Sequence, residues 1–390
     1  MIYLDHNASS PLRSRAREAL DEALAEHGNA SSVHAAGRRA RARVENARER
    51  VARLVGTTPA SVVLTSGGTE ANALALRGVI AGAMEAEDRI TRIFVTAIEH
   101  ESIRANAAAL AESVPGLKLN EIKVTGDGVV DLAAFRLQLM QGKGRALVCV
   151  MAANNETGAI QPVEAIAKIV RGECEDALLH VDAVQAAGRI ALSFDALGAD
   201  LMTISAHKLG GPLGAGALIL RDGTPFAPLF AGAQEMGRRA GTENVAAIAG
   251  FGAAAEEAQD HAAEMIRLRT LRGHFEAGIK TLAPDAVVFG EGAERLPNTS
   301  NFAIPGLSAE SALIALDLDG IALSSGAACS SGKVKPSHVL AAMGVDETLA
   351  RSGLRLSLGW SNTESDIDAA LAALGRLLDR KVGLRSAAAA

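Results

Sequence analysis

Short apolar runs alternate with amphipathic stretches over the first two-thirds of the chain. The apolar runs have the length of strands and lie at residues 61–65, 93–96, 146–151, 178–181, 201–205 and 216–220. Apolar residues at helical spacing predict helices at residues 13–26, 38–54, 69–79, 163–170 and 245–282. This alternation is typical of a parallel sheet covered by helices, so we expect the α/β class.

The pattern changes after about residue 286. Strand-like runs become shorter, and three helical patches lie near residues 309–317, 336–343 and 364–378. A chain of 390 residues can bury a substantial core and is long enough for two structural units. We expect a large domain at residues 15–260, and a smaller α+β domain made of residues 1–14 and 261–390, with the long helix at 245–282 connecting the two.

The charge pattern and the missing targeting signals predict a cytosolic protein. The net charge of -6 comes from intermixed acids and bases, and the one basic stretch, residues 38–53, carries interleaved glutamates as a solvated helix face does. One Trp and one Tyr leave little to stack on bases, so no nucleic-acid partner is expected. The N-terminus lacks a secretory pattern and no apolar run reaches the length of a bilayer span, so no membrane partner is expected.

The cysteines are three, at positions 149, 174 and 329, with no CxxC pair. This spacing argues against a disulfide framework and a cysteine-built metal site, so no metal is expected. Cys149 lies in an apolar run and is interpreted as a core residue. Cys174 lies between two glutamates, which predicts exposure and a raised thiol pKa. Cys329 lies among small, flexible residues that suit an exposed loop, and is the best candidate for a nucleophile.

The sequence TSGGTE at residues 65–70 follows an apolar run and opens a helical stretch. Glycines let the backbone turn there, and free N–H groups at a helix start can hold a phosphate. An ordinary glycine turn with Thr69 as the helix N-cap is the alternative. The chain has no GxxxxGK[ST] sequence, which excludes a nucleotide P-loop.

Asp182 is expected within an apolar strand, where an unpaired charge is costly and needs a cationic partner. A protonated ring nitrogen of a cofactor would serve, because a carboxylate keeps such a ring able to accept electrons. A salt bridge to an arginine is the alternative.

Lys208 and His100 follow two further strands. Lys208 lies between a strand and a glycine-rich turn, where partial desolvation lets a lysine form a Schiff base at neutral pH; the alternative is a solvated surface charge. His100 is expected to close its strand, at the sheet edge where α/β proteins bind ligands, and could stack on a ring or move protons. A structural histidine is the alternative.

Nine segments together resemble the NifS/IscS-like cysteine desulfurases of the class V aminotransferase family, in that family's order and over nearly the whole chain. They are YLDHNASSP, TSGGTEAN, EHESI, NNETGAIQP, HVDAVQAAG, SAHKLGGPLGAGAL, RRAGTEN, SSGAACSSGKVKPSHVL and GLRLSLG. The resemblance implies the fold type I of pyridoxal-phosphate enzymes: a large domain with a mainly parallel seven-stranded sheet, and a smaller domain.

The resemblance also implies a role for each matching residue. Lys208 would hold pyridoxal 5'-phosphate as a Schiff base, Asp182 would pair with the ring nitrogen, Gln185 would bind the ring hydroxyl, and His100 would stack on the ring. The phosphate would be held by Gly68, Thr69, Ser205, His207 and, from the second subunit of a homodimer, Thr242. The substrate carboxylate would be bound by Asn155 and Arg355, the latter through a two-pronged pair.

The implied reaction removes sulfur from L-cysteine. Lys208 would take the Cα proton, Cys329 would accept the sulfur as a persulfide, His100 would assist proton movement, and alanine would leave. The cysteine segment resembles the branch that passes sulfur to a Fe–S scaffold or thiolation protein. Selenocysteine lyase, or another class V aminotransferase or lyase, is the alternative activity, and a non-catalytic scaffold is a further one.

Overall fold

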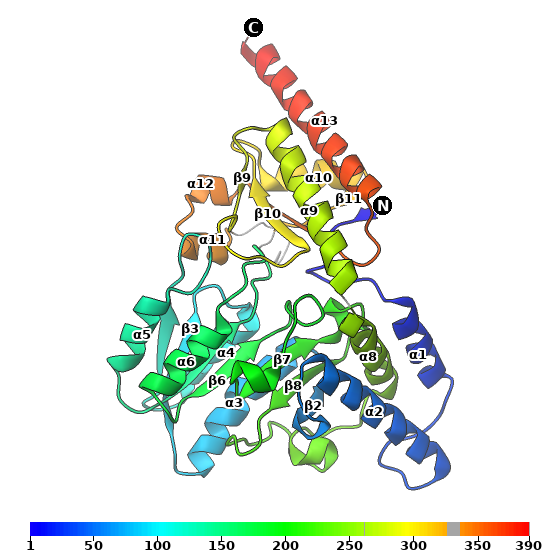
Figure 1. Cartoon of the computed structure of the whole chain (residues 1–390), viewed down its shortest axis with the longest axis vertical. Helices are drawn as coiled ribbons and strands as arrows, with labels where there is room; N and C mark the ends of the chain where they lie inside the picture. Colours follow the sequence, from blue (N-terminus) through cyan, green and yellow to red (C-terminus); the bar gives the residue numbers. More distant parts are fainter. Residues whose placement is uncertain (261, 326–335, 390) are drawn as a thin grey trace.

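A computed structural model of the chain describes residues 1–260, 262–325 and 336–389. Its central element is a seven-stranded sheet with the order β2-β8-β7-β6-β5-β3-β4 (Figure 1). β8 runs antiparallel to both of its neighbours, and the other adjacent pairs are parallel. The strands are β2 (Val62–Thr65), β3 (Ile90–Thr96), β4 (Lys118–Ile122), β5 (Arg145–Met151), β6 (Leu178–Asp182), β7 (Leu201–Ser205) and β8 (Gly216–Leu220). The expected α/β class with a mainly parallel sheet is confirmed.

Six of these strands form where apolar runs predict them, because both faces of the sheet are covered and the strands are apolar throughout. β4 is the strand that the apolar pattern misses. Its sequence, KLNEI, is mostly polar, and the strand pairs with β3 at the edge of the sheet, where Lys118 and Leu119 are exposed. An edge strand can be polar because solvent reaches it.

Helices cover both faces of the sheet. Helices α2, α5, α6 and α8 pack on the face that carries Val148 and Val150, and helices α3 and α4 pack on the face that carries Leu147 and Cys149. The alternation follows from the two-residue period of a strand. The helices of this part are α1 (Ser14–Leu24), α2 (Ala35–Leu54), α3 (Gly68–Glu85), α4 (Glu101–Ser113), α5 (Leu132–Met140), α6 (Val163–Glu173), α7 (Phe194–Leu197) and α8 (Val245–Glu257).

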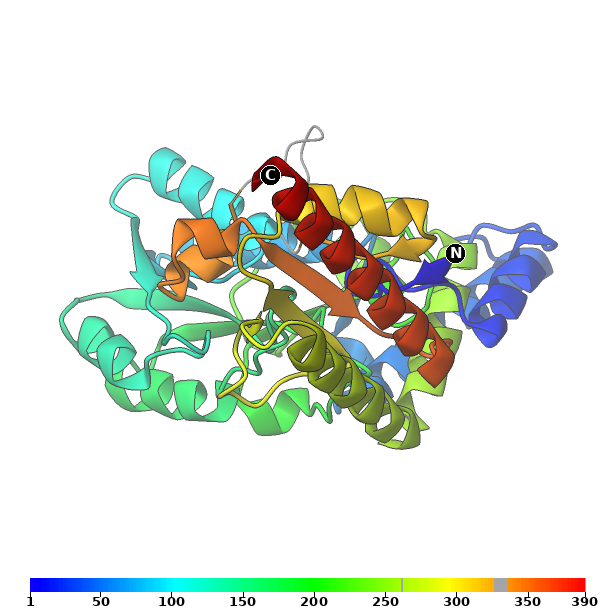
Figure 2. The same ribbon diagram turned by 90° about the horizontal axis from the view of Figure 1, so that it is seen from above.

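A smaller part lies above the large sheet in Figure 1 and contains a three-stranded antiparallel sheet, β12-β10-β9, and the parallel pair β1-β11. Figure 2, seen from above, shows α9 and α13 lying over the three-stranded sheet. The elements are β1 (Ile2–Tyr3), β9 (Val287–Val288), β10 (Thr299–Ala303), β11 (Ile321–Ala322), β12 (Gly353–Ser357), α9 (Ala262–Leu282), α10 (Ala309–Leu318), α11 (His338–Ala342), α12 (Glu347–Ala350) and α13 (Glu364–Ala389).

The single helix expected at residues 245–282 is wrong in one respect. α8 ends at Glu257 and is followed by the 3-10 turn Ala258–Asp260, and α9 begins at Ala262. α8 packs tightly on α1 and α2, where a methyl group added at Gly252 would lie 2.6 Å from the Cα atom of Ala47. α9 packs instead on β10 and α13. The helical pattern of the sequence does not predict such a break, because helix-forming residues continue on both sides of it.

Leu4 and apolar residues of α9, β10, β12 and α13 form a core separate from the cores of the large sheet. We propose that residues 15–260 form the large domain, and that residues 1–14 and 261–390 form the small one. The N-terminal strand β1 joins the small domain through its pairing with β11.

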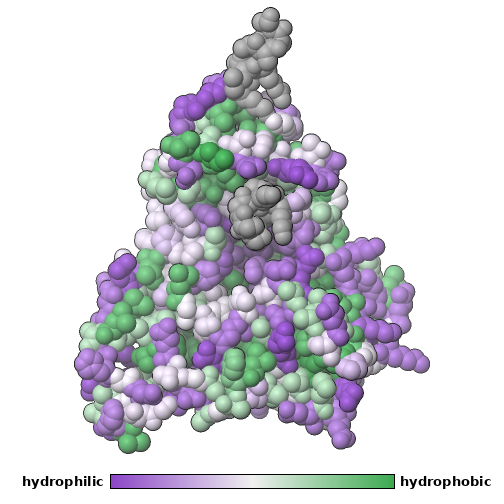
Figure 3. Space-filling model, turned by 180° about the vertical axis from the view of Figure 1, so that it is seen from behind, coloured by the Kyte–Doolittle hydropathy of each residue, from purple (hydrophilic) through white to green (hydrophobic). Residues whose placement is uncertain are grey.

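The surface is mixed in character. The face in Figure 3 shows hydrophilic and hydrophobic residues interspersed over both the upper and the lower part. Over the described stretches of chain, every helix is too short or too polar to cross a membrane.

A buried ion pair ties the segment before α8 to the large sheet. Arg48 of α2 contacts the Glu235 carboxylate at 2.5 and 2.8 Å, and both residues are 5% exposed. Glu235 also accepts the Leu64 N–H of β2 at 2.7 Å. The backbone of Glu235 is left-handed, with φ 48°, a conformation that costs energy for a residue with a side chain. The ion pair therefore holds a strained segment in place.

Replacing Arg48 by Met should lower the free energy of unfolding by about 3–5 kcal/mol, because the Glu235 carboxylate stays buried without its partner. Urea unfolding followed by circular dichroism measures this loss. Arg39→Met is the matched control on the same helix, since Arg39 is 58% exposed and its pair with Glu26 spans 3.8 Å, and should cost less than about 1 kcal/mol. Equal losses in the two variants would contradict this account.

Candidate active site

The residues predicted for the site follow the carboxyl ends of five strands. β2, β3, β5, β6 and β7 all run in the same direction, so their carboxyl ends lie along one edge of the sheet. The candidate residues that follow them are Gly68 and Thr69 after β2, His100 after β3, Asn155 after β5, Asp182 and Gln185 at the end of β6, and Ser205, His207 and Lys208 at the end of β7. In α/β proteins this edge is where ligands bind.

Gly68 and Ser205 come together at one point. A methyl group added at Gly68 would lie 3.4 Å from Ser205 Cβ and 3.0 Å from a methyl of Val184, so a larger residue there would crowd the site. α3 begins at Gly68 without a side-chain cap. The buried Ser205 hydroxyl has no hydrogen-bond partner in the described part of the protein. An uncapped helix start beside a free hydroxyl is a suitable seat for an anion.

Thr69 and His207 flank that point in the sequence. Thr69 is exposed in the first turn of α3. His207 is partly buried, and its Nδ1 atom lies 3.3 Å from the Ser9 hydroxyl. Burial, followed by the charges of Lys208 and Arg189, lowers the pKa of His207 to about 4, so the ring is neutral at physiological pH. It can donate a hydrogen bond to an anion but does not carry a charge to it.

Asp182 is the last residue of β6 and is 5% exposed. Its carboxylate accepts hydrogen bonds from the Asn72 amide at 2.8 Å and the Val184 N–H at 3.0 Å. It forms no salt bridge with any Lys, Arg or His that the structure describes. The alternative expectation of an arginine partner is therefore wrong for the described residues. The buried carboxylate is stabilised there by hydrogen bonds from neutral groups.

Lys208 ends a short 3-10 turn, Ala206–Lys208, directly after β7. Its ε-amino group donates to the carbonyls of Asn7 at 2.6 Å and Ala8 at 2.8 Å. Burial, followed by the charges of Arg189 and Arg355, lowers the pKa of Lys208 to about 7. A neutral amine is therefore available near neutral pH, as a Schiff-base lysine requires.

Arg189 is a buried cation behind Lys208 and forms no salt bridge with the carboxylates of the described residues. Its guanidinium donates to the carbonyl of Lys208 at 3.3 Å and to the side-chain oxygen of Gln185. Burial and the charge of Arg355 lower its own pKa to about 9. The Gln185 side-chain N–H donates to the Asn7 carbonyl at 3.0 Å. Gln185 is thus held between Arg189 and the N-terminal segment.

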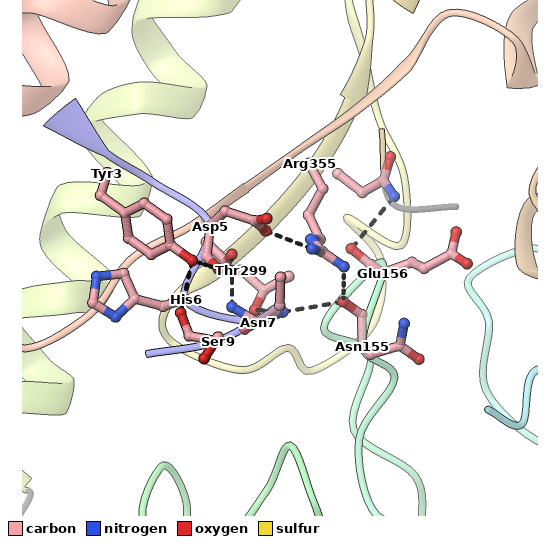
Figure 4. Close-up of polar contacts among 12 residues, drawn as sticks. Tyr3, Asp5, His6, Asn7, Ser9, Asn155, Glu156, Thr299 and Arg355 are labelled. Atoms are coloured by element: carbon pink, nitrogen blue, oxygen red, sulfur yellow. Dashed lines mark hydrogen bonds and ion pairs between the residues drawn. The ribbon is translucent and has the colours of Figure 1, made fainter. Parts of the chain in front are cut away.

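Arg355 of β12 reaches the site from the small sheet and is 4% exposed. Its guanidinium donates to the Asp5 carboxylate at 2.5 Å and to the Asn155 carbonyl at 3.1 Å (Figure 4). The Nε atom of Arg355 has no partner in the part of the chain that the structure covers. Figure 4 also shows Asn7 donating to the same Asn155 carbonyl, at 3.1 Å. The structure thus brings Asn155 and Arg355 together.

His100 does not close β3, which ends at Thr96. It is the N-cap residue of α4, because its Nδ1 atom accepts the Ser102 N–H at 3.1 Å. The ring is exposed, on the same edge of the sheet. The expectation of a strand-end residue is wrong by four positions, because a loop of three residues separates the strand from the cap. The position at the ligand edge stands.

The cysteines and Thr242 complete the expected set. Cys329 lies outside the described residues. Cys149 is fully buried, as expected for a core residue. Cys174 is partly buried against the core rather than exposed, and burial, followed by a hydrogen bond to Asp176, raises its pKa. Thr242 is exposed.

Sequence reasoning misses six side chains that shape the site: Asp5, Asn7, Asn72, Ser102, Glu99 and Arg189. Asp5 and Asn7 lie in the segment YLDHNASSP, directly after the short strand β1, so two polar residues that follow a strand were the available signal. Asn72 and Ser102 lie in TSGGTEAN and EHESI, but a polar residue within a helix carries no such signal. Glu99 is also buried, and burial, followed by the charge of Asp182, raises its pKa to about 8, so it is mostly protonated at neutral pH.

Pyridoxal phosphate fits these residues on three counts. The phosphate would meet the free Ser205 hydroxyl and the start of α3. A protonated ring nitrogen would supply the cation that Asp182 lacks. The aldehyde would meet a lysine that is half neutral near pH 7.

Comparison with known proteins gives consistent matches over nearly the whole chain. The family model for class V aminotransferases matches residues 2–370. The cysteine desulfurase IscS of Dictyoglomus turgidum is 39% identical over 382 residues, which cover 97% of this chain and 95% of that protein. The solved structure of a NifS-like protein from Rickettsia africae is 36% identical, with a TM-score of 0.86 over 97% of this chain and 99% of that one. SspA, solved in complex with cysteine, is 27% identical, with a TM-score of 0.79 over 92% and 99%.

The pKa of Lys208 can be measured by competitive labelling of the cofactor-free protein with acetic anhydride, followed by mass spectrometry of the Lys208 peptide. The Lys208 amine should reach half of its maximal reactivity at about pH 7. Arg189→Met should move this midpoint to higher pH, because removal of a nearby positive charge favours the ammonium form. Arg136→Met, which removes an exposed arginine, should leave it unchanged. A wild-type midpoint near the ordinary lysine value of about 10.4 would contradict the electrostatic account.

Proposed function

This chain belongs to the class V aminotransferase family, among its cysteine desulfurases, and on that premise we propose that it releases sulfur from L-cysteine with pyridoxal 5'-phosphate as cofactor. The observation that carries the proposal is a pair of features on neighbouring strand ends. Lys208 has an amine that is half neutral near pH 7, and Asp182 has a buried carboxylate without a cationic partner among the described residues. Each feature is unfavourable for an empty site, and each matches one end of the same cofactor.

When bound, pyridoxal phosphate supplies an electron sink for the charge that develops at the substrate Cα atom. Lys208 would bind its aldehyde, Asp182 would hold its ring nitrogen protonated, and His100 would stack on the ring. Gln185 would donate to the ring hydroxyl. The phosphate would be bound by Gly68, Thr69, Ser205 and His207.

Arg355 and Asn155 would bind the substrate carboxylate. Arg355 has one free donor, Nε, and a second donor engaged by Asp5. A substrate carboxylate that binds both nitrogens would compete with Asp5 for the second one. Asp5 therefore keeps the buried guanidinium paired until substrate arrives.

Lys208 and His100 would move protons. The Lys208 amine is half neutral near pH 7 and lies in a partly buried position, so it could take the proton from the substrate Cα atom. His100 lies exposed at the same edge of the sheet and can exchange a proton with the substrate thiol or with Cβ.

Cys329 would accept the sulfur. Its thiolate attacks the substrate sulfur, so an S–S bond forms as the Cβ–S bond breaks, and the electron pair of the broken bond leaves with Cβ. Protonation of Cβ, together with return of a proton from Lys208 to Cα, would then give alanine, so that L-cysteine and the enzyme thiol become L-alanine and an enzyme persulfide. The glycine-rich and serine-rich sequence around Cys329 suits delivery of that persulfide.

Two partners complete the proposal: a second copy of the chain, whose Thr242 would reach the phosphate, and a sulfur-acceptor protein of Fe–S assembly or thiolation in the cytosol. Thr242 is exposed in the single chain, and so are Leu229, Phe230 and Met236 in the segment that precedes it. Exposed large apolar side chains in one segment support a subunit interface there.

The purified holoenzyme should release sulfide and alanine in equal amounts from L-cysteine with a thiol reductant. Cys329→Ala should keep the cofactor absorbance but lose about a hundredfold or more in turnover, because it lacks the nucleophile. Cys174→Ala is the matched control and should keep normal turnover. Full activity in Cys329→Ala would contradict the persulfide step, and an aminotransferase or lyase would replace it.

A further inference from the structure

Two side chains, those of Asn72 and Ser102, join Asp182 to His100 through hydrogen bonds. The Asn72 amide nitrogen lies 2.8 Å from the Asp182 carboxylate and 2.9 Å from the Ser102 hydroxyl. The Ser102 hydroxyl lies 2.8 Å from Nδ1 of His100. Asn72 is 1% exposed and Ser102 is 8% exposed, so the two hydrogen bonds of the Asn72 amide are buried from water.

The chemistry of the groups determines the direction of each bond. An ionised carboxylate only accepts, so the Asn72 nitrogen must face Asp182, and a flipped amide would set its oxygen against the charge. The same nitrogen gives its second hydrogen to Ser102. The Ser102 hydroxyl therefore accepts from Asn72 and has its own hydrogen to donate to His100.

Nδ1 of His100 accordingly accepts from two groups, the hydroxyl and the backbone N–H of Ser102, the latter at 3.1 Å. A nitrogen that accepts carries no proton. A neutral His100 ring must then carry its single proton on Nε2, on the side away from α4.

We propose that Asn72 and Ser102 are positioning residues that hold Asp182 in place and fix His100 in the tautomer with its proton on Nε2. This inference rests on the proposed function, because it assigns both Asp182 and His100 to one cofactor site. His100 would then present a donor, not an acceptor, to the substrate before any proton moves. As long as Asp182 stays ionised, it orients the Asn72 amide, and so fixes which group donates in each hydrogen bond between Asp182 and His100.

A purely structural role is the competing explanation, because Asn72 belongs to α3 and Ser102 to α4, and these helices pack together. The two explanations differ in the histidine itself. A brace between helices would affect stability, whereas a positioning chain would affect the tautomer of His100.

The test is nitrogen NMR of the holoenzyme labelled with ¹⁵N-histidine, in which the His100 signals are identified by their loss in His100→Gln. The wild type should show a protonated Nε2 and an unprotonated Nδ1. Ser102→Ala removes the hydroxyl donor and leaves only the backbone N–H at Nδ1, so a fraction of the tautomer with its proton on Nδ1 should appear and kcat should fall by roughly tenfold, with the cofactor absorbance unchanged. Asn72→Ala should change both the tautomer and the absorbance, since it also frees Asp182. Ser102→Thr, which keeps the hydroxyl, should behave as the wild type.

Asn106→Ala is the matched control. The Asn106 amide donates to the Ser102 backbone carbonyl at 2.8 Å and is not part of the hydrogen-bonded series from Asp182 to His100. The tautomer of His100 should therefore stay fixed in this variant. A protonated Nδ1 in the wild type, or a tautomer unmoved by both Ser102→Ala and Asn72→Ala in folded protein, would overturn the inference. The NMR measurement does not need turnover. A protein that forms no sulfide but shows these tautomer changes would therefore refute the proposed function and leave the inference about His100 in place.

Discussion

The buried charge of Asp182 is the constraint on which the site depends. Burying a carboxylate at the carboxyl end of a central strand is costly. Here the hydrogen bonds from the Asn72 amide and the Val184 N–H offset only part of that cost. The positive groups nearby do not pair with it, because Lys208 and Arg189 bind backbone carbonyls and Gln185 instead. Such an arrangement favours a cationic ligand over either neutral or anionic rings.

The N-terminal segment connects the two parts of the molecule at this site. β1 belongs to the small part through its pairing with β11, yet the residues just after it supply the carbonyls that bind Lys208 and Gln185. Asp5 from the same segment pairs with Arg355. Eight residues at the start of the chain thus set the position of a lysine and an arginine that lie some 150 positions apart. The location of these groups depends on packing between the two parts, not on either alone.

The sequence predicts the large sheet well because its strands are buried on both faces and therefore read as apolar runs. It misses β4, whose polar residues face solvent at the edge, and the bend after Glu257, where both flanks keep a helical pattern. For the site, glycine-rich turns and charged residues after apolar runs point to Lys208, Asp182 and Gly68. Asn72 and Ser102 are not found this way, because a polar side chain in a helix shows its purpose only when its partners from other helices and strands are in place.

The account requires that Lys208, and no other lysine, bind the cofactor. Borohydride reduction of the holoenzyme makes any bond between a lysine and the cofactor aldehyde permanent, and mass spectrometry of the resulting peptides then locates it. The account predicts the added pyridoxyl mass on the peptide that carries Lys208, in an amount equal to the bound cofactor. An unmodified Lys208 peptide, with the added mass on an exposed residue such as Lys143, would contradict it.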